Sequence, residues 1–157
     1  MKNEIIAFMI VLIVFLYFLS TQEPPEPKDI VSEKEVLNYS SLLFNYKVIR
    51  YPTSVEITKP EENINVGLVT DPWNLNFGSI PGNGSSVKRY IAITNLEKKY
   101  STIKLKVYGN ISSLISFNKN DFTLNESTAV EVILNSTNAN FGNYTGEIDI
   151  IIKVPKY

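Results

Sequence analysis

Hydrophobic and polar positions alternate along much of the chain after residue 62. In residues 101–108 (STIKLKVY), Ile103, Leu105 and Val107 alternate with polar residues, and residues 146–154 (GEIDIIIKV) have the same two-residue period. This period is typical of strands that bury one face and leave the other in water. In the second run we expect Ile148, Ile150 and Ile152 to face the core, and Glu147, Asp149 and Lys153 to face water.

Further short runs of this kind are separated by turn signals. They are residues 64–70, 74–77, 86–94, 113–117 and 128–134. About seven strands at this spacing, with no convincing helix between them, are typical of a two-sheet domain. The pattern predicts an all-β fold, an Ig-like antiparallel β-sandwich, over residues 63–157. We expect residues 66–156 to fold alone.

The N-terminal segment has a different pattern. Residues 5–19 (IIAFMIVLIVFLYFL) contain no charged side chain, which predicts a helix about 22 Å long. That is short of the ~30 Å hydrocarbon core of a bilayer, a gap that Lys2 on one side and Ser20 and Thr21 on the other would close. We interpret residues 1–22 as a transmembrane helix that contacts membrane lipid through residues 5–19. A cleaved signal sequence and a buried helix of a soluble protein are the alternatives.

Residues 23–62 connect this segment to the predicted sandwich. The PPEP sequence at residues 24–27 cannot continue a helix and favours an extended, Pro-rich stalk. Residues 29–44 form either a short helix or part of the stalk. Residues 46–51 and 54–58 resemble one more strand, interrupted by Pro52.

The charges on either side of the apolar segment predict its orientation. Lys2 and the amino terminus lie before it, and Glu23, Glu26 and Asp29 follow it with one lysine, Lys28. The positive-inside rule then places the N-terminus in the cytoplasm and the C-terminal domain outside the cell, as in a single-pass protein of the cell membrane.

Six N-x-S/T sequons follow the apolar segment, more than an asparagine-rich chain gives by chance. The asparagines are Asn38, Asn83, Asn110, Asn125, Asn135 and Asn143. Most of them lie at predicted turns, where a glycan is tolerated. We therefore expect an exterior glycoprotein, if the host cell glycosylates.

The amino-acid composition excludes several classes of catalytic and metal-binding site. The 157 residues contain no histidine and no cysteine, so a Ser-His-Asp or Cys-His nucleophile and a thiolate metal site cannot be assembled. The formal net charge of −1 gives no reason to expect nucleic acid as a partner. We expect no enzyme activity, no cofactor and no metal site.

The glycine-rich stretch at residues 76–86 (NFGSIPGNGSS) raises the question of a phosphate-binding loop. It lacks the lysine of a P-loop, and the alternating residues 86–94 follow it where a P-loop needs a helix. We interpret the stretch as a corner between two strands, with Gly78 and Gly82 at positive φ, and expect no nucleotide.

The same stretch resembles the start of Ig-like sandwiches of the Hydin and major-sperm-protein type. The matching positions are Phe77, Gly78, Ile80, Gly82 and residues 91–95, and residues 142–152 (GNYTGEIDIII) resemble the final hairpin of that family. The resemblance covers residues 66–156. It implies a sandwich that makes protein contacts and carries no catalytic residue. With its N-terminal segment, the chain resembles small membrane-anchored exterior proteins of methanogenic archaea.

Two classes of function remain. The first is a non-enzymatic, membrane-tethered exterior sandwich that contacts an unknown protein partner at the cell surface, in a surface layer, a filament or a membrane complex. The alternative is a carbohydrate- or ligand-binding module that uses aromatic residues such as Trp73, Tyr108 and Tyr144. A single tryptophan beside a strand is more often packed in a core, so we expect Trp73 to pack there, with ligand contact as its other possible role.

Overall fold

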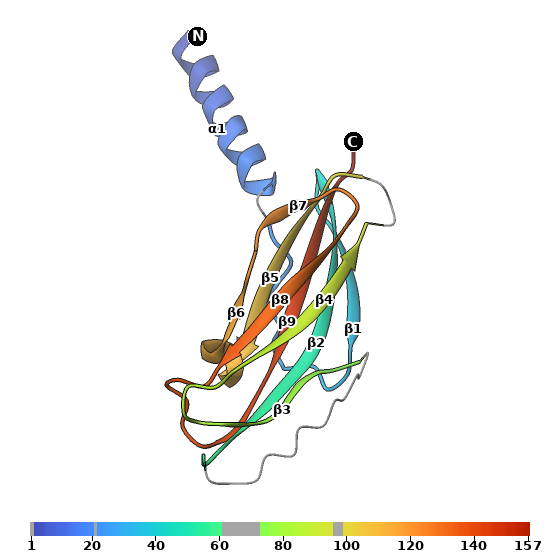
Figure 1. Cartoon of the computed structure of the whole chain (residues 1–157). Coiled ribbons are helices and arrows are strands. Elements are labelled where there is room, and N and C mark those ends of the chain that lie inside the picture. The colour runs from blue at the N-terminus through green and yellow to red at the C-terminus, as the bar shows by residue number, and fades with distance from the viewer. Residues whose placement is uncertain (1, 21, 61–72, 96–98) are drawn as a thin grey trace.

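The computed structural model describes residues 2–20, 22–60, 73–95 and 99–157 (Figure 1). Within them a helix precedes nine strands and one short 3-10 helix. These elements are α1 (Lys2–Ser20), β1 (Glu35–Ser40), β2 (Phe44–Thr58), β3 (Leu75–Pro81), β4 (Ser86–Thr94), β5 (Ser101–Gly109), η1 (Asn110–Leu114), β6 (Ile115–Phe117), β7 (Phe122–Leu124), β8 (Ser127–Asn135) and β9 (Gly142–Pro155). The expected strand at residues 64–70 lies outside the described residues.

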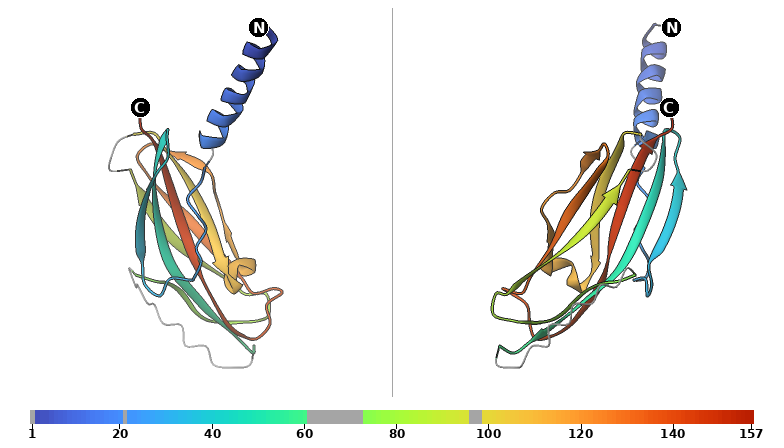
Figure 2. Two further views of the ribbon diagram at one scale, coloured as in Figure 1. Left: turned by 180° about the vertical axis from the view of Figure 1, so that it is seen from behind. Right: turned by 45° about the vertical axis from the view of Figure 1, so that its right-hand side comes forward.

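The strands form two sheets that face each other (Figures 1 and 2). The larger sheet has the order β1-β2-β9-β5-β7, with β3 also paired to β2, and the smaller sheet has the order β4-β8-β6. The pairs are antiparallel except β2 with β3, which run parallel. The sequence-based prediction of an all-β, largely antiparallel sandwich is confirmed, and the parallel pair was not expected.

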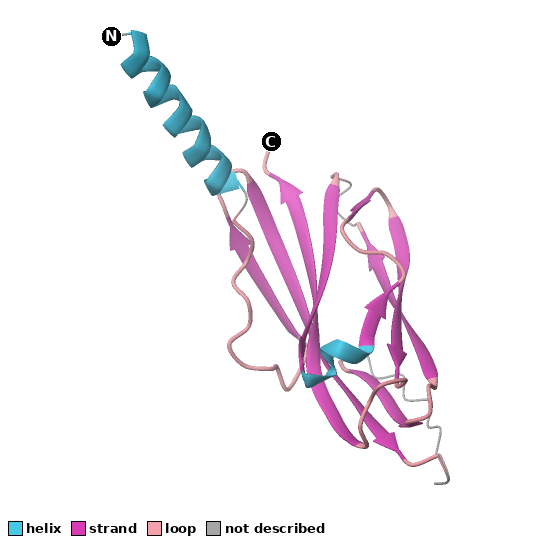
Figure 3. Cartoon of the chain, turned by 90° about the vertical axis from the view of Figure 1, so that its left-hand side faces the viewer, coloured by secondary structure: helices cyan, strands magenta, loops and turns pink. Residues whose placement is uncertain are grey.

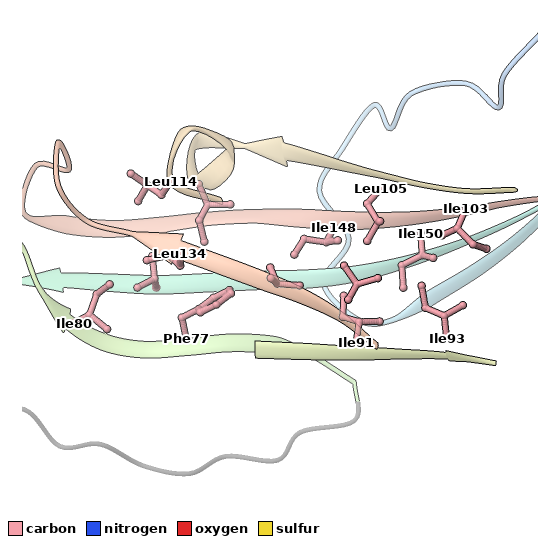
Figure 4. Packing of buried hydrophobic residues seen from close by; sticks show 14 of the residues in the cluster. Phe77, Ile80, Ile91, Ile93, Ile103, Leu105, Leu114, Leu134, Ile148 and Ile150 are labelled. Atoms are coloured by element: carbon pink, nitrogen blue, oxygen red, sulfur yellow. The ribbon is translucent and has the colours of Figure 1, made fainter. Parts of the chain in front are cut away.

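The core lies between the two sheets, where alternating side chains from both meet (Figure 4). Leu105 of β5 is paired with Ile150 of β9, and both are buried. The smaller sheet contributes Val130, Val132 and Leu134 of β8, which are fully buried. The predicted inward set Ile103, Leu105, Val107, Ile148, Ile150 and Ile152 belongs to this one cluster, so the predicted register is confirmed.

Strand β2 is central to the larger sheet. The additional strand predicted over residues 46–51 and 54–58 is confirmed by it, but that strand was expected in the linker before the sandwich and is part of the sandwich itself. Strand β2 pairs with β9 from Phe44↔Pro155 to Ile57↔Gly142. Pro52 does not interrupt β2. On the side of β2 that is away from β9, the neighbouring strand changes from β1 to β3 at this proline. β1 pairs with β2 only as far as Arg50, and β3 begins at Thr53. A proline without an N–H is tolerated at such a gap in the ladder.

Residues 22–34, which we call the strap, lie along the outer face of the larger sheet (Figure 3). Pro24 is buried, and Glu23 forms an ion pair with Lys104 of β5. The prediction that the Pro-rich segment stands away from the domain as a stalk is therefore wrong. A proline-rich segment is extended whether it is free or bound, so its composition did not distinguish the two.

Helix α1 projects away from the sandwich in every ribbon view (Figures 1–3). Its large apolar side chains from Ile5 to Phe18 are exposed, so it is not a buried helix. No helix in the described part of the chain is long and apolar enough to cross a membrane. The transmembrane helix predicted over residues 1–22 is therefore not supported. Its uncharged stretch, at about 22 Å, is shorter than the ~30 Å hydrocarbon core.

The glycine-rich stretch is a corner between β3 and β4, as expected, with turn residues 82–84 between the two strands. Gly78 has φ 73°, at the point where the β2–β3 register shifts. Gly82 does not have the positive φ that was expected. The space beside it is taken instead by Phe141 and Ile57, whose side-chain atoms lie 2.9 and 3.0 Å from the position of an added Cβ. Within this stretch, the other glycine with a positive φ is Gly84, at 87°.

Candidate functional site: a buried charge cluster under the strap

Three charged residues gather on the outer face of the larger sheet. Glu147 and Asp149 are two positions apart on β9, so both side chains leave the same face of the strand. Arg50 of β2 lies directly opposite Asp149 in the antiparallel pair. The period of the two strands thus brings two carboxylates and one guanidinium together on the face that does not contribute to the main core.

The three groups are within ion-pair distance. The Nε of Arg50 lies 3.4 Å from Oδ2 of Asp149 and 3.7 Å from Oε1 of Glu147. A terminal nitrogen of the same guanidinium lies 3.7 Å from Oε2 of Glu35, on the edge strand β1. The Glu35 side chain is half exposed, so it forms the rim of the cluster rather than its centre.

The strap closes the cluster off from water. The backbone N–H of Val31 donates a hydrogen bond of 2.8 Å to Oε2 of Glu147. Glu147 is 0% exposed and Asp149 is 2% exposed. The expectation that these two carboxylates face water is wrong, because it treated the second face of the sheet as uncovered.

A signal for this cover exists in the sequence. Ile150, Ile151 and Ile152 are consecutive, and a run of three apolar residues on a strand indicates that both faces are buried. Ile151 packs in a second apolar cluster with Tyr46 and Val48 on the outer face. The position of the covering segment has no comparable signal, because the strap has no periodic pattern.

The cluster holds more negative than positive charge in a dry environment. Burial, and secondly the neighbouring charge of Glu147, raises the pKa of Asp149 to about 7, against the opposing effect of Arg50. Among the described residues, Nε of Arg50, Oε1 of Glu147 and Oδ1 of Asp149 lack a hydrogen-bond partner. Unpartnered buried polar atoms of this kind favour uptake of a proton by one carboxylate, which lowers the net charge of the cluster.

A second set of ion pairs holds the start of the strap. The Nζ of Lys104 lies 2.5 Å from Oε1 of Glu23, and the Nζ of Lys106 lies 3.1 Å from Oε2 of the same residue. Lys106 is also 3.6 Å from Glu26. The hydrogen bond from Lys104 holds the pKa of Glu23 below its usual value. The two lysines are the polar members of the alternating β5 strand, so the outer side of this strand binds the strap.

This arrangement is suited to fastening the strap rather than to catalysis. A general acid or base must reach the proton that it transfers, and both carboxylates of the cluster are enclosed. In the described residues, no group of three or more potential ligands among Asp, Glu, His and Cys is placed to hold a metal ion. The cluster, with the Glu23 ion pairs, is therefore a latch that fastens the strap to the sheet.

The sequon asparagines are spread over the surface and do not form one site. Asn38 is in β1, Asn83 is in the β3–β4 turn, Asn110 begins η1, Asn125 is in the β7–β8 turn, Asn135 ends β8, and Asn143 is in β9. All six are exposed. Their modification stays a prediction.

The three aromatic residues of the alternative function are not brought together. Trp73 is 62% exposed, which contradicts the expected place in the core. The Nζ of Lys34 lies 5.9 Å from the centre of its ring. Tyr144 packs against the main core and its hydroxyl donates to the carbonyl of Asn140. Tyr108 lies on β5, where its neighbour Val107 faces that core, so Tyr108 belongs to the outer face.

Comparison with known proteins gives no match to a family model, a curated protein or a solved structure. The function is therefore inferred from the chemistry of the chain itself.

Proposed function

We propose that this chain is a non-enzymatic β-sandwich that is attached to a membrane through α1 and makes protein contacts outside the cell. The observation that carries the proposal is the surface of α1. Apolar side chains on all its sides are exposed, among them Ile5 at 59%, Phe8 at 67% and Val11 at 66%. A helix that is hydrophobic all round is stable only when it is covered.

A bilayer is the cover that fits this helix best. A helix that docks in a protein groove needs one apolar face, and the opposite face stays polar. Val11 and Ile13 lie about 200° apart around the helix axis, and both are about as exposed as their neighbours. Hydrocarbon surrounds a helix on all sides, so it satisfies this distribution without a second protein.

The outer face of the smaller sheet is suited to contact with a protein partner. Tyr90 is 63% exposed at the middle of β4, next to Glu131 of β8, whose carboxylate accepts a hydrogen bond of 3.3 Å from the Tyr90 hydroxyl. Lys88 donates to the same carboxylate at 3.1 Å. An exposed tyrosine surrounded by small and polar groups is typical of interfaces between separately folded proteins.

The placement on the exterior rests on the sequons, because the charge rule applies only to a helix that crosses the bilayer. All six sequon asparagines are exposed, so a glycan on any of them would extend into solvent. Mass spectrometry of the protein from its native cells tests this part of the proposal. The alternative of a carbohydrate-binding module is not favoured, because Trp73, Tyr108 and Tyr144 do not form one surface.

The attachment is tested on native cells by a carbonate wash of the membrane fraction, followed by sequencing of the mature N-terminus. We expect the chain to remain with the washed membranes and to begin at Met1 or next to it. Release into the wash, or a mature N-terminus near residue 21, would contradict the proposal. The control is a soluble protein of the same cells, which the wash should remove.

A further inference from the structure

The turn between β1 and β2 is a second exposed apolar element. It consists of Ser41, Leu42 and Leu43, and the two leucines are 53% and 41% exposed. Polar residues and glycine normally occupy such turns. Two adjacent exposed leucines at the tip of a hairpin are therefore unusual.

Three contacts hold the turn in place. The backbone N–H of Ser41 donates to the carbonyl of Phe44 at 2.9 Å, and the N–H of Lys156 donates to the carbonyl of Leu43 at 3.0 Å. Phe44, directly after the turn, lies under the ammonium group of Lys153 at 3.9 Å. The leucines are thus presented outward from a fixed backbone.

The turn lies at the end of the sandwich from which α1 leaves. The register places Phe44 opposite Pro155, so the turn and the C-terminus share this end. The two ends of the chain emerge from it together (Figures 1 and 2). Glu23 is fixed to Lys104 of β5, and only residues 21 and 22 separate it from the end of α1. The helix and the turn are therefore close to each other on one side of the domain.

We propose that Leu42 and Leu43 insert into the surface layer of the same bilayer that holds α1, so that this end of the sandwich rests on the membrane. The inference rests on the proposed function, because it needs α1 in the bilayer. Lys153 and Lys156 are half-buried beside the turn, so the docked orientation brings two positive charges near the lipid phosphates, and Tyr157 is fully exposed at the same end. Leucine, tyrosine and lysine together are typical of segments at the membrane interface.

Site-directed fluorescence tests this docking in the full chain, which has no cysteine of its own. Three single-cysteine variants, Leu42→Cys, Asn83→Cys and Val11→Cys, carry an environment-sensitive dye in vesicles with and without nitroxide-labelled lipid. The three positions are exposed, so the dye does not disturb the core. Asn83 is in the turn before β4, at the opposite end of the sandwich, and Val11 is in α1.

We expect blue-shifted emission and loss of intensity with nitroxide lipid at positions 42 and 11, and neither change at position 83. Quenching at position 11 without quenching at position 42 would overturn the docking and leave the attachment through α1 standing. No quenching at position 11 would overturn the attachment and the docking with it. Equal quenching at positions 42 and 83 would show a sandwich without the proposed orientation.

Discussion

Arg50 and Asp149 face each other across β2 and β9, with 3.4 Å between the guanidinium Nε and a carboxylate oxygen, on a sheet face that the strap covers. The pair joins the first long strand of the sandwich to the last. Because Glu147 lies beside it, a single cation serves two enclosed carboxyl groups. The stability of the fold therefore depends on this cation.

Replacement of Arg50 by methionine should be strongly destabilising. At pH 8, where Asp149 has released its proton, it leaves two buried carboxylates without their cation, and loss of one partner of a buried ion pair costs about 3–5 kcal/mol. Urea unfolding followed by circular dichroism measures the change. The control is Lys88→Met, which breaks an exposed ion pair with Glu131 and should cost no more than about 1 kcal/mol. Equal effects of the two substitutions would contradict the role given to the buried cluster.

The raised pKa of Asp149 predicts that stability depends on pH. The folded chain keeps the proton up to about pH 7, whereas the unfolded chain releases it near pH 3.9. The contribution of this group is fully present below about pH 4 and is lost as the pH rises through 7. Asp149→Asn should therefore equal the parent chain at low pH and exceed it in stability at pH 8.

Asp121→Asn is the control for the pH series. Asp121 is exposed and has φ 53°, a conformation that asparagine accepts. This variant removes a carboxylate that is exposed, so it measures how much of any change comes from the loss of a surface carboxylate alone. If the Asp149→Asn curve runs parallel to the parent curve from pH 4 to pH 8, the buried carboxylate does not hold its proton.

The hydrogen bond from Val31 to Glu147 should be essential for fastening the strap. Val31→Pro removes the N–H that Glu147 accepts, and an unsatisfied buried acceptor costs about 1–3 kcal/mol. Limited proteolysis should then cut residues 22–34 faster than in the parent chain. Val31→Ala keeps the N–H and should show the slower cleavage. Similar cleavage of both variants would mean that the ion pairs of Glu23 alone hold the strap.

The alternation of polar and apolar residues predicted the strands that have a clear two-residue period, such as β4 and β9. β4 has the bounds that were expected from residues 86–94, and Ile148, Ile150 and Ile152 face the core as predicted. The pattern could not reveal what covers the outer face, because the strap contacts residues more than a hundred positions away, as Val31 does with Glu147. β7 is only three residues long, too short for a period to be visible.

Truncation at residue 63 should prevent folding, contrary to the expectation that residues 66–156 fold alone. Such a chain lacks β2, whose pairing with β9 extends over the length of that strand. It would also lack the buried side chains of Val48, Val55 and Ile57, and the residues that pack against them would be exposed. Circular dichroism during heating should show a cooperative transition for residues 22–157 and none for residues 63–157. A cooperative transition in the shorter chain would show that β2 is dispensable.

Flotation with vesicles of uncharged phospholipid tests the attachment through α1 most directly. The full chain is compared with residues 22–157, which keep the strap and every strand of the described fold but lack the exposed apolar helix. The account predicts that the full chain rises with the vesicles and that residues 22–157 remain in the dense fraction. A full chain that stays in the dense fraction, or a shorter chain that rises equally, would contradict it.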